Sequence, residues 1–280
     1  MLGKLIKYEF KNTAKVMLAI YSFVAVIATL GTIAFALMDP DINTAFTDFV
    51  SSTLLILYGL SIFALFIVTY IYVCVHFYKT MYSDQGYLTH TLPVSPVTTF
   101  HVKLLVSFCW MMGALILLIL SVFMLLMGAT HGKFFTDFSA ELRAELIAES
   151  NAVFAVLGLS FGEFWAFIGF SMVIGCISYL LMVYASMSIG QLFNQNKIGF
   201  SIVAGIAIYF IEQILNTVLL LILGFSNHEI LFEESETMTD AAFASFWCAT
   251  TWASSLLSIF FMIVLYIICH VIVKKHINLD

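Results

Sequence analysis

Six long apolar segments constrain the fold of this chain more than any other feature of its sequence. They cover residues 14–38, 52–77, 97–127, 154–189, 198–225 and 246–273. A helix of roughly 20 apolar residues crosses the hydrocarbon core of a bilayer, and each segment reaches that length. Backbone N–H and C=O groups inside lipid need partners within their own segment. The sequence therefore predicts an all-α polytopic membrane protein, with residues 1–280 as a single transmembrane domain.

Composition supports this class. Only 10% of the 280 residues are charged and 62% are hydrophobic, whereas soluble domains carry about 25% charged residues. The net charge of -6 argues against a nucleic-acid partner. The five cysteines include no C-x-x-C pair and the seven histidines no H-E-x-x-H pair, so we predict neither a disulfide framework nor a metal site.

The N-terminal residues 1–13 have the pattern of an amphipathic helix at the membrane surface. Lys4, Lys7 and Lys11 recur at intervals of three and four, with apolar residues roughly opposite. Glu9 falls on the apolar side, where we expect it to meet a protein partner or a lysine. A solvated basic N-terminus is the competing interpretation.

The distribution of basic residues predicts the orientation. Nine of the eleven lysines and arginines fall on one side of the predicted topology, and this side is expected to be cytoplasmic. Both termini are then cytoplasmic, while twelve of the 17 acidic residues lie in loops on the opposite side.

The polar stretch 78–96 joins the second and third spans on the predicted cytoplasmic side. Its pattern predicts a short helix over residues 82–92. Ser95-Pro96 then predicts the start of the next helix, with serine as N-cap and proline in the first turn. We interpret the stretch as the place where a soluble partner acts on the membrane protein.

Residues 158–162 match the G-x-S-x-G pattern of serine hydrolases, which makes an intramembrane hydrolase using Ser160 an alternative. The only histidine in the sixth span, His270, lies about 35 Å along that span, too far for a catalytic pair. We therefore interpret Gly158 and Gly162 as small residues that allow a neighbouring helix to approach. Glu163, beside Trp165, is expected to lie at the membrane interface.

A polar stripe runs along the fifth span. It contains Ser201, Gly205, Tyr209, Glu212, Gln213 and Asn216 at helical spacing. A charged carboxylate at the bilayer centre costs about 2.5–3.5 kcal/mol on insertion scales, so this face should point at protein or at water. A subunit interface, a translocation path and a hydrogen-bonded cluster within the bundle all stay open, as does a secondary transporter that protonates Glu212.

The chain resembles the permease subunits of bacterial type-2 ABC exporters, which are six-span half-transporters with a separate ATPase. The likeness rests on the six spans, the basic N-terminal helix, Gly86-Tyr87-Leu88, Thr91-Leu92-Pro93-Val94-Ser95 and Lys103. The chain departs from many relatives in having Asp84-Gln85 where they have an Arg-Glu pair.

The resemblance implies a cytoplasmic coupling helix over residues 82–92, seated in a groove of the ATPase. The implied contact residues are Tyr82, Asp84, Gln85, Gly86, Tyr87, Leu88, Thr91, Leu92 and Pro93. It further implies a dimer of permease subunits in the bacterial cytoplasmic membrane, with no enzymatic activity of its own. The chain has no G-x-x-x-x-G-K-[ST] phosphate loop, so the partner would bind ATP and Mg²⁺. The implied substrate is a peptide, an antimicrobial or a hydrophobic drug.

Overall fold

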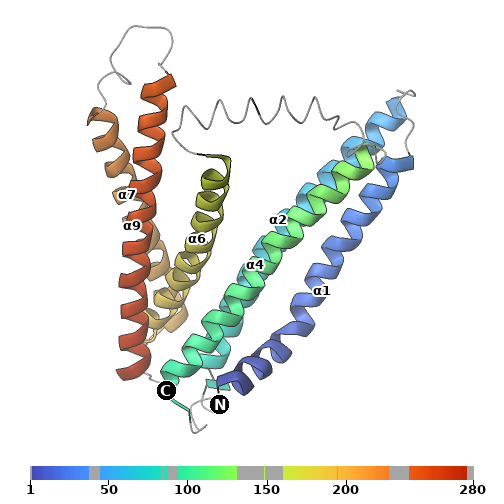
Figure 1. Cartoon of the computed structure of the whole chain (residues 1–280). Helices are drawn as coiled ribbons and strands as arrows, with labels where there is room; N and C mark the ends of the chain where they lie inside the picture. The colour runs from blue at the N-terminus through green and yellow to red at the C-terminus, as the bar shows by residue number, and fades with distance from the viewer. Residues whose placement is uncertain are drawn as a thin grey trace. The chain divides into compact units, whose positions relative to one another are not determined.

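The computed structural model describes residues 2–37, 45–83, 85–86, 94–130, 148, 160–193, 195–226 and 240–275. Its helices are α1 (Leu2–Leu37), α2 (Ala45–Tyr82), α4 (Pro96–Ala129), α6 (Phe161–Gly190), α7 (Lys197–Ser226) and α9 (Asp240–Lys275) (Figure 1). Six helices in the described part of the chain are long and apolar enough to cross a membrane. The predicted all-α, six-span architecture is therefore confirmed.

The chain divides into two compact units. Unit 1 contains residues 1–77 and 98–143, and unit 2 contains residues 78–97 and 144–280. The boundary falls inside α2, between Phe77 and Tyr78. As a result, the stretch 78–96 belongs to the same unit as α6, α7 and α9.

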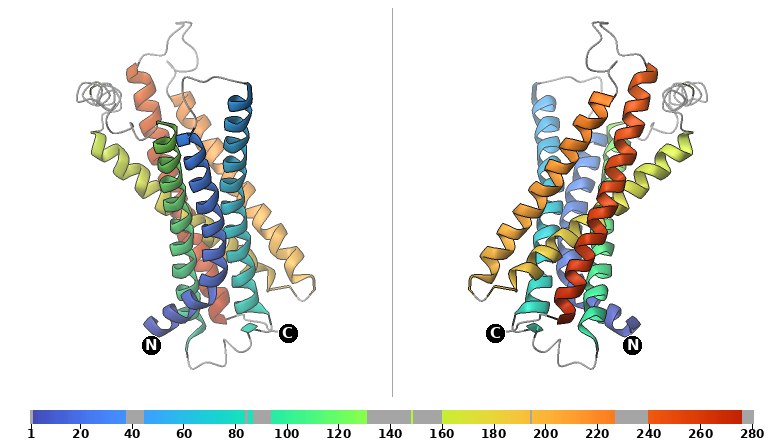
Figure 2. Two further views of the ribbon diagram at one scale, coloured as in Figure 1. Left: turned by 90° about the vertical axis from the view of Figure 1, so that its right-hand side faces the viewer. Right: turned by 90° about the vertical axis from the view of Figure 1, so that its left-hand side faces the viewer.

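In unit 1, α1, α2 and α4 run side by side (Figure 2). Each helix contributes one residue to a buried core made of Val24, Leu65 and Ala114. Polar contacts cross the same interfaces: the Tyr21 hydroxyl donates to the Trp110 carbonyl, and the hydroxyls of Tyr58 and Ser121 lie 2.7 Å apart. In hydrocarbon such bonds add to van der Waals packing as a source of helix association.

The closest approach of α1 to α4 requires a glycine. A Cβ atom at Gly128 would lie 2.5 Å from the carbonyl oxygen of Thr32 and 3.0 Å from its Cα. Gly31, one residue before Thr32, faces the Leu125 side chain in the same interface. Small residues thus let the two backbones meet, as they do in many membrane helix pairs.

In unit 2, α6 supplies most of the core, with Leu180, Leu181, Tyr184 and Ala185 all buried. The buried face of α9 complements it through Phe261, Leu265, Cys269, Ile272 and Val273. By contrast, only Ser201 and Gly224 are buried on α7. The other residues of α7 are exposed or half-buried in the described structure.

The helix boundaries both confirm and correct the sequence predictions. α4 begins at Pro96, as the Ser95-Pro96 signature predicts. α6 begins at Phe161 and not at residue 154, because Ser160 has extended backbone (φ -77, ψ 159) and caps the helix. α1 joins the predicted surface helix and the first span in one continuous helix, whose first turns bend away from the rest (Figure 2).

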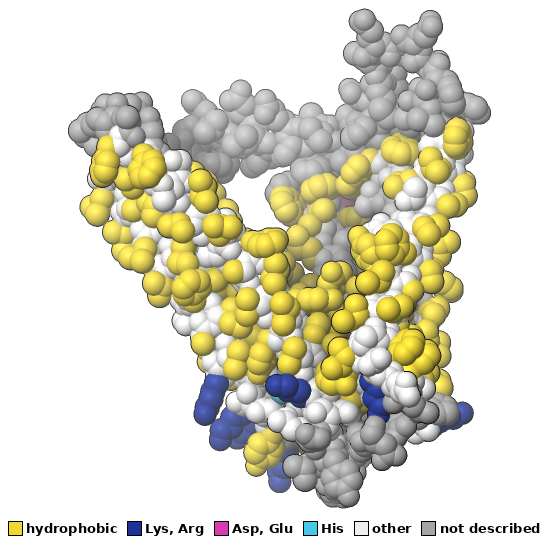
Figure 3. Space-filling model, turned by 180° about the vertical axis from the view of Figure 1, so that it is seen from behind, with side chains coloured by type: hydrophobic (Ala, Val, Ile, Leu, Met, Phe, Trp, Pro, Cys, Tyr) yellow, Lys and Arg dark blue, Asp and Glu magenta, His cyan; other side chains and the backbone are white. Residues whose placement is uncertain are grey.

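Within each unit the described lysines gather at one end of the helices. In unit 1 they lie where α1 and α4 begin, and in unit 2 where α2 and α9 end and α7 begins. Figure 3 shows these side chains as blue groups beyond the hydrophobic flanks. This is the pattern that membrane proteins show on one face of the bilayer.

We expect Gly128→Ala to lower the thermal stability of the purified protein in detergent. The added methyl group would be forced against the backbone of Thr32, which cannot rotate away, and overpacking of this kind costs about 1–3 kcal/mol. Loss of the monodisperse peak in size-exclusion chromatography after heating measures the effect.

Gly59→Ala is the matched control, because a Cβ at Gly59 meets nothing within 4 Å. Equal stability changes in the two variants would contradict the close-packing argument.

Candidate functional site

Three charged or polar side chains meet where α1, α2 and α4 come together. Oε1 of Glu9 lies 2.7 Å from Nε2 of His76 and 2.9 Å from Nζ of Lys103. Lys103 is only 3% exposed, so its charge is almost completely removed from solvent. Because each residue comes from a different helix, Glu9 holds the three helices of unit 1 in one register. Glu9 thus meets a lysine of its own chain, one of the two partners expected for an acid on the apolar face.

Aromatic side chains fix the surroundings of this cluster. The Trp110 indole donates to Oγ1 of Thr13 at 2.9 Å, one helical turn beyond Glu9. The Trp110 ring also contacts Phe10, with ring centroids 5.8 Å apart. On the other side, Tyr72 stacks on His76 at 5.8 Å with an interplanar angle of 15°. The Tyr72 ring thus limits the rotation of His76, while Trp110 packs against two neighbours of Glu9 on α1.

The three lysines predicted to face the membrane surface on α1 are exposed: Lys4, Lys7 and Lys11. They therefore lie on the part of α1 that the other helices of unit 1 leave uncovered, whereas Glu9 points inward. The lysines of α1 therefore lie on one face of the helix and Glu9 on the other, as their spacing in the sequence predicts.

The N-terminal end of the predicted coupling segment is anchored in unit 2. Tyr82 is 5% exposed, and its hydroxyl lies 2.7 Å from the Ser188 hydroxyl on α6. Ser188 in turn donates to the Tyr184 carbonyl at 2.7 Å. The last residue of α2 is thereby tied to the C-terminal end of α6.

Beyond this anchor, Gln85 and Gly86 are helical, and the N–H of Gly86 donates to the Ser83 carbonyl at 2.6 Å. Gly86 is buried and Gln85 is exposed. The other predicted contact residues lie outside the described part of the chain: Asp84, Tyr87, Leu88, Thr91, Leu92 and Pro93. The coupling helix over 82–92 therefore stays a prediction.

Gln191 is a buried polar residue close to the same anchor. It follows Ser188 by three residues on α6 and is 1% exposed, yet neither its amide nitrogen nor its amide oxygen has a hydrogen-bond partner among the described residues. An unpaired buried polar group costs about 1–3 kcal/mol. This end of α6 therefore has hydrogen-bonding capacity that the described structure does not use.

The polar stripe on α7 divides into two parts. At its start, Ser201 is buried and approaches Gly190 of α6, and Gly205 lies against Ser186. Farther along, Tyr209 and Gln213 are exposed, while Glu212 and Asn216 are half-buried.

Two side-chain hydrogen bonds are shown for the four residues of this second part, and both stay within α7. Nδ2 of Asn216 donates to the Glu212 carbonyl at 3.2 Å, and Oγ1 of Thr217 donates to the Gln213 carbonyl at 2.8 Å. Among the described residues, no other helix supplies a hydrogen bond to the Glu212 carboxylate. The described residues show no interhelical hydrogen bond for this second part, and the three interpretations of the stripe stay open.

Ser160 and Glu163 form a capping box at the start of α6. The N–H of Glu163 donates to the Ser160 hydroxyl at 3.3 Å, while Oε2 of Glu163 accepts from both the N–H and the hydroxyl of Ser160 at 2.8 Å. The serine of the G-x-S-x-G pattern therefore satisfies free backbone groups at a helix end. His270 belongs to the C-terminal end of α9, and no bond joins it to Ser160 in the described structure.

The prediction that Gly158 and Gly162 allow a neighbouring helix to approach can be examined only at Gly162. A Cβ at Gly162 would meet nothing within 4 Å, so no described neighbour makes a close approach there. Gly158 lies outside the described residues. The described part of the chain also contains no group of three or more His, Cys, Asp or Glu side chains that could hold a metal ion.

Comparison with known proteins finds no matching family model, curated protein or solved structure.

Lys103→Met should destabilise unit 1 by about 3–5 kcal/mol, because it leaves the Glu9 carboxylate without its lysine in a buried site. Thermal unfolding in detergent measures the loss. Replacing both residues, Glu9→Met with Lys103→Met, should restore much of the stability, since no buried charge then lacks its partner.

Lys11→Met removes a lysine from the exposed face of the same region and serves as the control. Purely additive losses for the Glu9 and Lys103 substitutions would show that the two side chains are not coupled.

Proposed function

We propose that this chain is the membrane-spanning permease subunit of an ATP-driven exporter. In this proposal two six-span subunits form the translocation path, and a separate ATPase drives it through the stretch 78–96. The ATPase binds ATP and Mg²⁺, and the permease itself catalyses no reaction. The substrate class is a peptide, an antimicrobial or a hydrophobic drug.

The observation that carries the proposal is the attachment of the coupling segment to unit 2. The stretch 78–96 enters through Tyr82, whose hydroxyl is bonded to Ser188 at the end of α6. A force applied to residues just beyond Tyr82 would therefore reach α6 directly, and through α6 the helices α7 and α9 that pack on it. Packed elements transmit displacements because protein interiors are dense and resist compression.

The amide of Gln191, which has no hydrogen-bond partner among the described residues, supports the same function. It lies one turn from Ser188, so it offers an alternative hydrogen-bond site at the point where the segment is anchored. A shift of the segment along α6 could exchange one bonded state for another. Two discrete arrangements of this kind are the physical requirement for coupling between distant sites.

The uncovered half of the α7 stripe supports a second subunit. Glu212, Tyr209 and Gln213 lie on a membrane helix that the described helices of this chain leave largely open. A second permease subunit, identical or different, would cover this face or enclose a watery path along it. Either arrangement removes the cost of holding a carboxylate against lipid.

The clustering of lysines at one end of each unit supports a location in the bacterial cytoplasmic membrane with both termini on the cytoplasmic side. The coupling segment then faces the compartment that contains ATP. The flanks between the two ends remain in contact with lipid.

A secondary transporter is the second candidate, favoured by the half-buried Glu212 carboxylate without a described partner. Protonation of this residue would let it cross the bilayer region as a neutral group. The alternative of an intramembrane hydrolase has no comparable observation, because Ser160 is engaged in a helix cap.

Association with an ATPase provides the first test. The tagged permease, purified in mild detergent from its native membranes, should retain a nucleotide-binding protein with a phosphate loop. Gln85→Ala and Leu88→Ala should reduce its recovery about tenfold if they remove central contacts. Mass spectrometry and ATP hydrolysis of the purified complex measure the effect.

Lys11→Ala changes an exposed residue of α1 on the proposed cytoplasmic side and is the control for substitutions that do not touch the ATPase contact. Recovery of no ATPase with the wild-type chain, or equal recovery with all variants, would refute the coupling assignment.

Glu212→Gln separates the two transport mechanisms. In proteoliposomes without ATP or a partner, an ATP-driven permease should move no ethidium when a pH gradient is applied, and the variant should behave like the wild type. Ethidium fluorescence on encapsulated DNA measures the flux. Gradient-driven flux that disappears in Glu212→Gln and persists in Gln213→Ala would replace the exporter with a proton-coupled transporter.

A further inference from the structure

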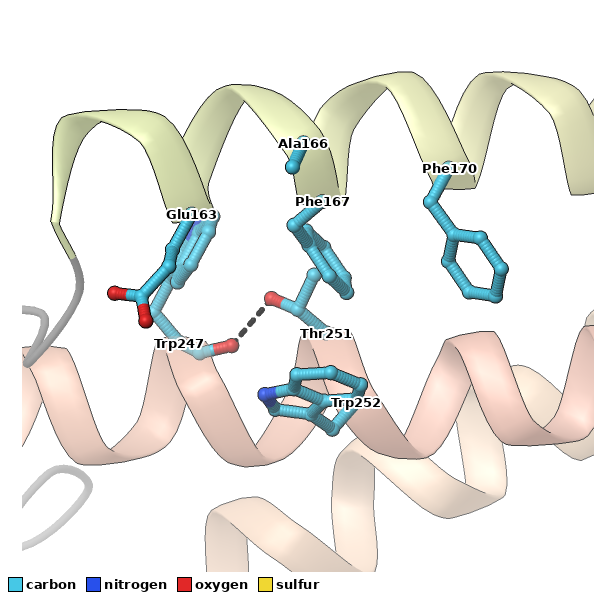
Figure 4. Close-up of a pocket in the computed structure, with 7 residues that line it drawn as sticks. All are labelled: Glu163, Ala166, Phe167, Phe170, Trp247, Thr251 and Trp252. Atoms are coloured by element: carbon cyan, nitrogen blue, oxygen red, sulfur yellow. Dashed lines mark hydrogen bonds between the residues drawn. The ribbon is translucent and has the colours of Figure 1, made fainter.

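A cavity of about 340 Å³ opens between the N-terminal halves of α6 and α9 in unit 2. Its principal walls are four aromatic side chains, Phe167 and Phe170 from α6 and Trp247 and Trp252 from α9, with Glu163 at one end. In Figure 4 the two phenylalanines project from α6 toward α9, and Glu163 lies beside Trp247. The volume falls within the range of small-molecule sites.

The rings are held in place by contacts with each other. Phe167 and Trp252 have ring centroids 5.0 Å apart at an interplanar angle of 57°. Trp247 is supported by Phe164, with centroids 5.9 Å apart and rings nearly parallel at 26°. Trp252 and Phe170 nevertheless remain 53% and 50% exposed, so ring surface is still available to a ligand.

The carboxylate at the end of the cavity has a fixed position. Oε2 of Glu163 accepts both of its bonds from Ser160 in the capping box, whereas no hydrogen bond is shown for Oε1. These bonds orient the exposed Glu163 side chain and leave one oxygen for another partner. No described lysine or arginine lines the cavity to neutralise this charge.

We propose that this cavity binds an organic ammonium cation. Aromatic rings attract cations through the negative potential of their faces, and tryptophan does so best. A fixed carboxylate beside such rings adds direct charge attraction, while the apolar walls accept the alkyl or aryl substituents of the cation. A helix N-terminus by itself would favour an anion, but Glu163 already occupies that position in α6.

Two sources carry the same ammonium group. One is the headgroup of a phospholipid such as phosphatidylethanolamine or phosphatidylcholine, whose acyl chains would lie along the helices. The other is a free basic amphiphile. The cavity would bind the ammonium group of either molecule, and changing the lipid composition distinguishes the headgroup from the free amphiphile. The proposal concerns equilibrium binding, so it stands independently of the partner ATPase and of transport.

The test uses the full-length protein in nanodiscs of phosphatidylglycerol, a lipid without an ammonium group, with radiolabelled benzyltrimethylammonium as the probe. Equilibrium dialysis against empty nanodiscs should show saturable binding. Choline should displace the probe better than 3,3-dimethylbutanol, which has the same shape with carbon in place of the charged nitrogen. Equal displacement by the two compounds, or no saturable binding, would overturn the proposal.

Glu163→Gln removes the charge but keeps the capping box, which accepts glutamine as well as glutamate. We expect it to weaken probe binding about three- to fivefold, and Trp252→Leu to weaken it similarly. Trp165→Leu is the matched control, because Trp165 is exposed on the same helix and does not line the cavity. Unchanged affinity in Glu163→Gln would also overturn the proposal.

Adding phosphatidylethanolamine to the nanodiscs identifies the source of the natural ligand. Weaker probe binding would mean that the lipid headgroup occupies the cavity. Unchanged binding would mean that the cavity takes free cations, and both results retain the ammonium site.

Discussion

The structure depends on the requirement that backbone hydrogen bonds be satisfied inside lipid. Each helix meets this requirement alone, so the backbone contributes little to choosing which helices pack together. The choice falls to small residues and to a few polar side chains. In unit 1 these are Gly128, which admits the backbone of Thr32, and Glu9, which joins α1 to α2 and α4. A chain composed mostly of apolar residues is thus specified by a few exceptions to that composition.

The polar contacts at the lysine-rich end of each unit have different consequences. In unit 1, Glu9 contacts both His76 and Lys103, so these polar side chains are paired across the three helices. In unit 2, Tyr82 is bonded to Ser188 while the amide of Gln191 has no described partner. The described structure thus pairs the side chains of the first cluster, whereas it leaves a donor and an acceptor of Gln191 unused in the second.

Much of the fold could be predicted from the sequence because apolar length and helix-start signals are local. The six spans and the start of α4 at Pro96 follow from such signals. A lysine could be expected as a partner of Glu9, but not which lysine, nor His76, since these contacts join residues 94 and 67 positions away. The predicted span 154–189 begins before the N-cap of α6 at Ser160, because hydrophobicity alone does not mark where a helix starts. Ser160-Phe161-Gly162-Glu163 has the S-x-x-E pattern of a capping box, and that signal was available in the sequence.

Glu163 and Glu212, the two carboxylates in the helices of unit 2, differ in whether a nearby residue of the same helix can stabilise the charge. Glu163 has a serine three residues earlier, so the capping box holds its carboxylate without help from another helix. Glu212 lies in the middle of α7, where every backbone N–H is already used by the helix. It cannot obtain a similar local cap, and the described residues offer no other. The described residues therefore do not meet the energetic requirement of this carboxylate, which a second subunit, water or a proton would satisfy.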